Sequence, residues 1–469
     1  MSEEKAVSRR EFLKLAGIAG AAIGGAGGLG GLLAACGSSS TTTTAATSAT
    51  TAATTATTAA APTTTVAGAT TTMAGATTTA VATSMETGDP VTIGAITSET
   101  GDNALTGGEL KWAYQKALDD QNAKGGVKLN DGKVHPVKIT FVDDQSSITQ
   151  AQTAAEQLIK SDNIKVILSS NTTPNNQAAA TVCEQYQAYY QIATSWIDDP
   201  GQIGGMHLKW SSDVFEMAGK AGLAAVNANK NLDSGPVTTF AVLTENDPDG
   251  IGFGDGTVAG LKAAGWTVAA YEHFVPGQKD FSSIVLKFKQ LGVEGLVTLI
   301  SPADGITWVR QMKQQGWAPK FMFGYKGFWP AAFMHSLGAD SNYICHDGFW
   351  SEDLPFPYDK ELGAAFEAAH NGDTSNSVGL SYANCQVLYQ AIENAGVFEP
   401  GAIRDKVFGQ TFKGTTIGDI VYGAVYPNDP GIAYWPLLGF QWIDGKRVIV
   451  APPQYVTGKT QTFKPWNQR

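Results

Sequence analysis

The sequence contains few of the residues from which metal sites and nucleophile sites are built. Its 469 residues include 6 histidines and 4 cysteines, and none of them forms a C-x-x-C or H-E-x-x-H pattern. The G-x-S-x-G elbow of serine hydrolases is missing, and Thr457–Thr460 (TGKT) lacks the upstream glycine of a P-loop. We therefore expect no catalytic residue, no metal site and no cofactor.

Long runs of lysine and arginine are also missing. The chain has 32 basic and 43 acidic residues, which gives a formal net charge of −11. Such a charge keeps a protein dispersed in water, but it does not supply the basic surface that nucleic-acid binding requires. We expect no nucleic-acid partner.

The first residues have the features of an export signal. Arg9 and Arg10 precede an apolar, glycine-rich stretch, Leu15–Leu33, and Leu33–Cys36 (LAAC) closes it. The arginine pair resembles a twin-arginine signal, and LAAC resembles a bacterial lipobox, whose cysteine becomes lipidated and N-terminal. The alternative is a single membrane span, for which this glycine content makes a poor helix. We expect residues 1–35 to be a signal and Cys36 to anchor the protein outside the cytoplasm, at the outer face of the cell membrane.

A low-complexity segment follows the predicted lipidation site. Ser38–Glu86 consists almost entirely of Thr, Ala and Ser. It lacks the apolar periodicity needed to bury a core, so we expect it to be disordered. We interpret residues 36–88 as a lipidated tether that lifts a folded body off the membrane, and glycosylation of its threonines stays open.

From about Asp89 onward, strand-like and helix-like segments alternate. Short apolar runs are separated by segments whose apolar residues recur every three or four positions. The predicted strands are 91–97, 137–142 and 165–168, followed after a gap by 239–244, 267–271, 295–300 and 321–323. The predicted helical stripes include Leu110, Ala113, Tyr114, Ala117 and Leu118, and later segments around 151–159, 178–182, 258–261, 281–291 and 306–314.

This alternation predicts an α/β fold with two doubly wound lobes, each built on a parallel sheet with helices on both faces. The pattern restarts near Thr239, which favours two sheets over one. Ligands bind such sheets at the carboxyl ends of their strands. A cleft between the lobes is therefore the expected place for a small-molecule site.

The body resembles the Leu/Ile/Val-type periplasmic binding proteins, the type I solute-binding components of ABC transporters. The resemblance extends over about residues 89–455 and depends on the order and spacing of many short motifs. They are Gly94–Thr97, Gly125–Val127, Phe141–Gln145, Thr181–Glu184, Lys209–Trp210, Asn246–Gly250, Ala263–Trp266, Pro276–Phe281 and Gln311–Gly316.

The resemblance implies two lobes joined by a hinge of three crossings. Lobe one would hold 89–210 and 351–432, lobe two would hold 211–350 and 433–455, and 456–469 would be a C-terminal tail. It also implies that a small ligand is held between the lobes, that the lobes close around it, and that the closed form delivers it to an ABC permease in the membrane.

In the family, the loop after the third strand of lobe one binds a ligand carboxylate through a hydroxyl and backbone amides. The matching loop here is Ser169–Pro174 (SSNTTP), and a predicted helix follows it, whose N-terminus favours an anion. The resemblance gives the hydroxyl role to Thr172, with Asn171 beside it. The alternative is that Thr172 or Thr173 only caps the helix.

The resemblance supplies four more candidates. Thr194 and Ser195 would hydrogen bond the ligand and Trp196 would pack on it, although Trp196 could instead belong to the hinge core. Phe253 stands where the family commonly places a tyrosine that stacks on the ligand.

Lys326 departs from the family pattern. Amino-acid binders of this type carry a glutamate there, which pairs with the ligand ammonium. A lysine would repel an ammonium and attract an anion, so we expect a ligand without an α-ammonium, such as a small carboxylate or aromatic acid. A branched-chain amino acid is the ligand that the family itself suggests. The alternative for Lys326 is a side chain that points into solvent.

Two other functions stay open from the sequence alone. The same fold serves as a ligand-sensing ectodomain that feeds a signalling partner rather than a permease. An enzyme on a similar α/β fold is the third hypothesis, and it would require turnover of a substrate. Without Cys36, three cysteines are left, so at most one disulfide can form among them, and the spacing does not select a pair.

Overall fold

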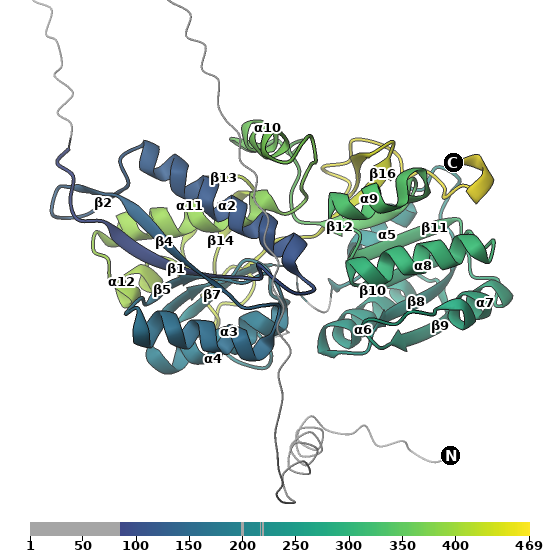
Figure 1. Ribbon diagram of the computed structural model, residues 1–469, viewed down its shortest axis with the longest axis horizontal. Coiled ribbons are helices and arrows are strands. Elements are labelled where there is room, and N and C mark those ends of the chain that lie inside the picture. The colour runs from purple at the N-terminus through teal and green to yellow at the C-terminus, as the bar shows by residue number, and fades with distance from the viewer. Residues whose placement is uncertain (1–84, 198–200, 216, 218–219) are drawn as a thin grey trace, which may run out of the picture. The chain divides into compact units, whose positions relative to one another are not determined.

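A computed structural model describes residues 85–197, 201–215, 217 and 220–469 (Figure 1). The predicted signal, Cys36 and nearly all of the tether lie outside the described residues. The compact unit spans Val81–Arg469 and contains two larger sheets, each the base of one lobe. Within the described residues, every helix is too short or too polar to span a bilayer.

The first lobe is built on a six-stranded sheet with the order β15-β7-β6-β5-β1-β4. All of its neighbouring strands run parallel. Its strands are β1 (Val91–Thr97), β4 (Val137–Asp143), β5 (Val166–Leu168), β6 (Tyr189–Gln191), β7 (Ser211–Phe215) and β15 (Ile432–Tyr434).

Helices cover both faces of this sheet. In Figure 1, α2 and α11 lie above it and α3 and α4 below it. The five apolar residues of the predicted stripe on α2 are all buried, as the spacing of three and four predicts. The helices are α2 (Ala104–Ala123), α3 (Ile148–Glu156) with a π-helical turn at Gln157–Ser161, α4 (Thr173–Tyr186), α10 (Asp359–Ala369), α11 (Val378–Ala395) and α12 (Pro400–Asp405).

The second lobe is built on a seven-stranded sheet with the order β17-β16-β12-β11-β10-β8-β9. The strands β8 to β12 are parallel neighbours, and β16 and β17 add an antiparallel edge. The strands are β8 (Thr239–Glu245), β9 (Thr267–Phe274), β10 (Gly295–Ile300), β11 (Phe321–Lys326), β12 (Cys345–Gly348), β16 (Leu438–Ile443) and β17 (Lys446–Ala451).

Both faces of the second sheet are buried, each in a different hydrophobic cluster. Along β10, Val297 and Leu299 belong to one cluster, whereas Leu296 and Ile300 belong to the other, because successive strand residues point to opposite faces. The first cluster includes residues of α5 (Leu223–Lys230) and α6 (Pro248–Ala263). The second includes residues of α7 (Ser282–Gln290), α8 (Pro302–Gln314) and α9 (Ala331–Leu337).

Two hairpins and two short 3-10 helices lie outside the two larger sheets and their helices. The hairpins β2 (Val127–Lys128) with β3 (Val134–His135) and β13 (Thr411–Thr415) with β14 (Gly418–Val421) each form a two-stranded sheet. Short 3-10 helices lie at Gly338–Ser341 and Trp466–Gln468.

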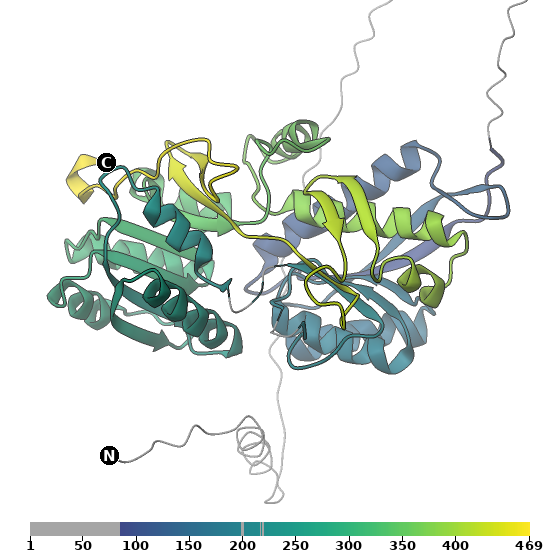
Figure 2. The ribbon, with the colours of Figure 1, turned by 180° about the vertical axis from the view of Figure 1, so that it is seen from behind.

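The crossings between lobes fall later than the sequence predicts. The strand Ser211–Phe215, predicted to open lobe two, instead pairs with β6 in the first sheet. The strand Ile432–Tyr434 likewise pairs with β7, so the third crossing follows Tyr434 and not residue 432 (Figure 2). Both strands are short, and each joins the first sheet by pairing with a separate strand. A local sequence pattern does not reveal which sheet such a strand joins.

The last residues are not a free tail. Thr460 is buried, and its hydroxyl donates to the carbonyl of Ala228 over 2.8 Å. Phe463 is also buried, and Trp466 donates its indole N–H to the carbonyl of Trp317. The segment 456–469 therefore packs on lobe two. The described cysteines, Cys183, Cys345 and Cys385, are buried free thiols.

Candidate functional site

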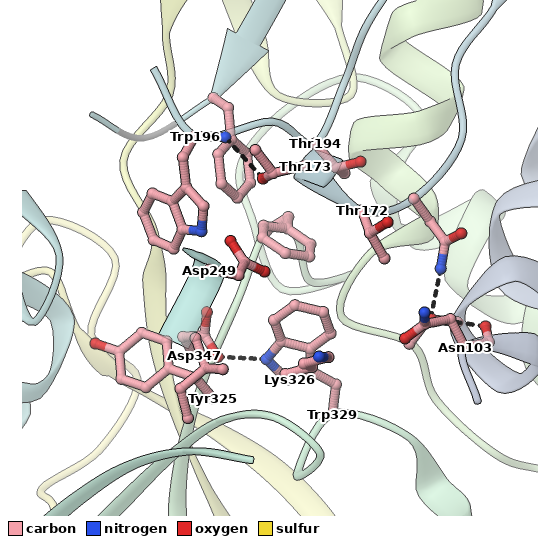
Figure 3. A pocket seen from close by; sticks show the side chains of 15 residues that line it. Asn103, Thr172, Thr173, Thr194, Trp196, Asp249, Tyr325, Lys326, Trp329 and Asp347 are labelled. Atoms are coloured by element: carbon pink, nitrogen blue, oxygen red, sulfur yellow. Dashed lines mark hydrogen bonds between the residues drawn. The ribbon is translucent and has the colours of Figure 1, made fainter. Parts of the chain in front are cut away.

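A cavity with about 530 Å³ of empty space, part of it open to solvent, lies at the carboxyl ends of strands from both sheets (Figure 3). Its size is ordinary for a small-molecule site. The first lobe contributes Asn103, Thr106, Asn171, Thr172, Thr173, Thr194, Trp196 and Phe215. The second lobe contributes Asp249, Leu299, Tyr325, Lys326, Trp329, Asp347 and Phe349.

Thr172 lies where the sequence predicts it, in the loop between β5 and α4. It is the N-cap residue of α4, yet its side chain does not cap the helix. The hydroxyl of Thr173 accepts the backbone N–H of Trp196 over 3.1 Å. The first backbone bond of α4 is Asn176 N–H to the Thr172 carbonyl, so the amides of the first turn face the cavity end of the helix. Neither threonine therefore has the capping role that was the alternative.

A buried aspartate holds this loop in place. Asp144, which is fully buried, follows β4 and accepts hydrogen bonds from the hydroxyls of Ser98 and Ser170. It also accepts from the side-chain amide of Asn175 at 2.9 Å and from the backbone N–H of Ser146. Because these donors come from the ends of β1, β4 and β5 and from α4, one carboxylate fixes the loops that surround Thr172.

Asn171 and Thr194 complete the polar wall of lobe one. The amide of Asn171 donates to the hydroxyl of Thr106 over 2.7 Å, and that hydroxyl donates to the carbonyl of Asn103. Thr194 donates to the carbonyl of Ser170 over 3.3 Å. This wall carries hydroxyls and amides but no charged side chain.

Trp196 lines the cavity and also touches the second lobe. Its ring packs edge-on against Phe215, with centroids 5.2 Å apart, and lies 6.1 Å from the ring of Phe253. Its backbone N–H is the group that Thr173 holds, so the loop after β6 is tied to the start of α4. Trp196 therefore borders the cavity and packs on apolar rings at the same time, so its position is compatible with both alternatives.

Two predicted site residues lie behind the cavity wall. Ser195 is fully buried, and its hydroxyl has no hydrogen-bond partner within the described part of the chain. Phe253, on α6, is 2% exposed and packs against the ring of Tyr325 with centroids 4.1 Å apart. Phe253 thus supports Trp196 and Tyr325 and does not itself line the cavity.

Lys326 lines the cavity and does not point into solvent. Its side chain is 21% exposed, and its ammonium lies 2.7 Å from the carboxylate of Glu245, at the end of β8. Glu245 is 1% exposed, and burial raises its pKa while Lys326 opposes that shift. Lys326 itself ends β11 in the left-handed region, with φ of 60°, a conformation that a non-glycine residue adopts at some cost.

Two more acidic residues border the cavity on the same side. Burial raises the pKa of Asp249 to about 6, whereas Lys326 favours its charged form. Burial also raises the pKa of Asp347 well above its ordinary value, and the indole N–H of Trp329 donates to that carboxyl group. The described residues contain no group of three or more His, Cys, Asp or Glu suited to a metal ion.

Aromatic rings form the apolar part of the wall. Trp329 packs edge-on against Phe349 with centroids 4.9 Å apart, and Arg447 donates to the Trp329 carbonyl. A smaller hollow beside these rings shares five residues with the main cavity and adds Leu110, Ser377 and Ser381. Trp329, Phe349, Asp249 and Asp347 also line the cavity but were not predicted from the sequence. Trp329 and Phe349 follow the ends of β11 and β12 and Asp249 lies in the first turn of α6, so the strand-end signal could have found these three, whereas Asp347 lies within β12.

A family model described as periplasmic binding protein matches residues 90–426. Among curated relatives, Leu/Ile/Val-binding protein homolog 3 of Brucella melitensis is 25% identical over 362 residues, covering 76% of this chain and 93% of that protein. An amino acid binding protein of Pseudomonas aeruginosa is 30% identical over 243 residues, covering 50% of this chain and 59% of that protein.

Solved structures are similar over most of the chain. A leucine-binding protein from Thermotoga maritima superposes with a TM-score of 0.66 at 18% identity, covering 78% of this chain and 99% of that one. A branched-chain amino acid transporter substrate-binding protein from Streptococcus pneumoniae, solved with isoleucine, gives a TM-score of 0.65 at 19% identity, covering 77% and 100%. At these identities the likeness establishes the fold alone.

Proposed function

This chain belongs to the family of periplasmic binding proteins, and on that premise we propose that it captures a small carboxylate-bearing solute between its lobes and delivers it to an ABC permease. Family membership confirms three expectations directly. The fold is the bilobed type I fold, the chain binds solutes outside the cytoplasm, and it is not an enzyme. The nature of the ligand, the permease and the lipid anchor are parts of the proposal.

The carboxylate end of the ligand is assigned to the loop between β5 and α4. What supports this is the uncapped start of α4, where the Thr172 hydroxyl makes no capping bond and the first-turn amides have no helical partner. The N-terminus of a helix is a ready-made anion site, because its amides and its dipole both favour negative charge. Asp144 holds this loop before a ligand arrives, which lowers the cost of ordering it on binding.

The apolar end of the ligand is assigned to the ring-lined side of the cavity. Trp196, Trp329 and Phe349 provide apolar surface there, and the adjoining hollow next to Leu110 extends it. This lining suits a branched or aromatic side chain. It is consistent with the relatives, one of which is a Leu/Ile/Val-binding protein homolog.

Closure of the lobes is the step that couples capture to delivery. Trp196 on lobe one already contacts Phe253 on lobe two, so the two walls meet at the cavity. A ligand that touches both walls favours the closed arrangement by its differential affinity for it. The proposed lipid on Cys36 and the tether at 36–88 would keep the body near a membrane permease.

A ligand screen with matched variants tests the proposal. Thermal-shift measurements on the purified protein with the common L-amino acids and small aliphatic or aromatic acids should identify a set of carboxylates that stabilise it, because a ligand that binds only the native state raises Tm. Thr172→Val should weaken calorimetric affinity for the best of them by about tenfold. Thr181→Val, on the exposed side of α4, is the control and should have no effect. Equal binding of the matching uncharged amides, or no binding of any carboxylate, would contradict the proposal.

A further inference from the structure

We propose that the Asp249 carboxylate binds a cationic group of the ligand and thereby determines which carboxylates the cavity accepts. This inference rests on the proposed function, because it concerns the other end of the same ligand. It is supported by the distribution of charge around the cavity, by the partners of each charged group, and by the position of Asp249.

The two walls of the cavity differ in charge. The wall of lobe one presents hydroxyls and amides, including those of Thr172 and Asn171, and no ionised side chain. The wall of lobe two and the residues directly behind it carry one cation, Lys326, and several acidic groups: Glu245, Asp247, Asp249 and Asp347. A ligand that spans the cavity therefore meets anion-binding groups at one end and an excess of carboxylates at the other.

Most of these charged groups are already engaged. Lys326 and Glu245 form an ion pair of 2.7 Å, so together they present no net charge. Asp247 caps α6 by accepting the backbone N–H of Gly250 over 2.7 Å. Burial favours the uncharged form of Asp347. Asp249 forms none of the ion pairs found among the described residues. Its carboxylate hydrogen bonds with the side chain of Trp196, and Lys326 favours its charged form, but it lines the cavity without a counter-ion in direct contact.

Asp249 is placed where a bridging ligand would reach it. It lies in the first turn of α6, and Figure 3 shows its carboxylate in the space bordered by Trp196, Tyr325 and Lys326, opposite Thr172. The neighbouring indole and phenol rings would add cation–π attraction for an ammonium in that space. The pKa of about 6 means that the group is mostly ionised at neutral pH.

The ion pair with Glu245 changes the effect that the charge of Lys326 is expected to have on a ligand. If the charge of Lys326 were free, the cavity would favour a ligand without an ammonium, as predicted from the sequence. In the structure, Glu245 neutralises Lys326, and the acidic function moves from the end of β11 to the start of α6. The inferred ligand class is a zwitterion, with its carboxylate at α4 and its ammonium at Asp249.

Pairs of ligands that differ only in the ammonium group test the role of Asp249 separately from the proposed function. The affinity of the purified protein is measured by calorimetry for L-leucine, L-isoleucine and L-phenylalanine, and for the three acids that lack only the ammonium group. Each pair is measured on the native protein, on Asp249→Asn, and on Asp255→Asn. The last variant removes an equal charge from an exposed position on the same helix, outside the cavity.

The expected result is that the native protein prefers the amino acid in at least one pair. Asp249→Asn should reduce affinity for that amino acid by about tenfold or more and leave the deaminated acid unchanged or tighter. Asp255→Asn should change neither by more than about twofold, since an exposed charge is screened. Preference for the deaminated acids, or equal losses for both members of a pair, would overturn this inference and leave the proposed function standing. Binding of neither class would overturn both.

Discussion

The buried ion pair between Lys326 and Glu245 gives a prediction whose size follows from the structure. In Lys326→Met, the Glu245 carboxyl is 1% exposed and loses its 2.7 Å partner. It then has to take up a proton or remain charged without compensation. The cost at pH 7 cannot much exceed that of protonating a carboxyl whose ordinary pKa is 4.5, which is about 3 kcal/mol at 1.36 kcal/mol per pH unit.

This bound makes the effect dependent on pH in a definite direction. The uncompensated Glu245 has a raised pKa, so the destabilisation shrinks as the pH falls toward 4.5 and should be below about 1 kcal/mol at pH 5. The double variant Lys326→Met with Glu245→Gln removes both charges and should stay within about 1 kcal/mol of the native protein. Urea unfolding at pH 5 and pH 7 measures the four ligand-free proteins of this double-mutant cycle: the native protein, the two single variants and the double variant.

Two outcomes would refute this reasoning. If Lys326→Met costs the same at pH 5 as at pH 7, Glu245 is not the group left uncompensated. If the two single substitutions add without coupling in the double variant, the ion pair contributes nothing to the stability of lobe two.

Further predictions concern other parts of the site. Asp144→Ala removes the acceptor of four hydrogen bonds and should lower the free energy of unfolding by about 3 kcal/mol or more in urea, and an unchanged midpoint would contradict its structural role. Ionising Asp249 costs stability as pH rises from its ordinary pKa of 3.8 through about 6, so Asp249→Asn should raise the free energy of unfolding in urea at pH 7 by up to about 3 kcal/mol, and a lower free energy of unfolding would be inconsistent with that cost. Amino-acid affinity should fall about tenfold per pH unit below 6 in the native protein, and a flat calorimetric profile would argue against Asp249 as the receptor. A thiol reagent should label Cys183, Cys345 and Cys385 slowly in the native protein and fully in urea, because all three are buried. Peptide mapping separates them from Cys36, and rapid native labelling of any of the three would contradict that burial.

The fold was largely predictable because its signals are local. Apolar runs such as Val91–Thr97 and stripes such as the one on α2 record burial in their own periodicity. The assignment of Ser211–Phe215 and Ile432–Tyr434 to a lobe was not predictable in this way. Each of these short strands is placed by its neighbours in the first sheet, and nothing in five or three residues states which sheet they join.

The site residues were likewise predictable only where their signal is local. Asn171, Thr172, Thr194 and Trp196 follow strand ends of lobe one, and a strand end is visible in the sequence. The neutralisation of Lys326 was not visible, because Glu245 lies 81 residues earlier and meets it only in the folded sheet, where β10 lies between their two strands. Ser195 and Phe253 lie next to true cavity residues but point behind the wall, and only side-chain packing decides that difference.

The central claim is that one small zwitterion bridges the two lobes. The most direct measurement is a crystal structure of the protein with the amino acid that gives the largest rise in Tm. We predict electron density in the cavity between the lobes, with the ligand carboxylate within hydrogen-bonding distance of the Thr172 hydroxyl and its ammonium beside Asp249. Density that contacts only one lobe, or that lies outside this cavity, would contradict the account.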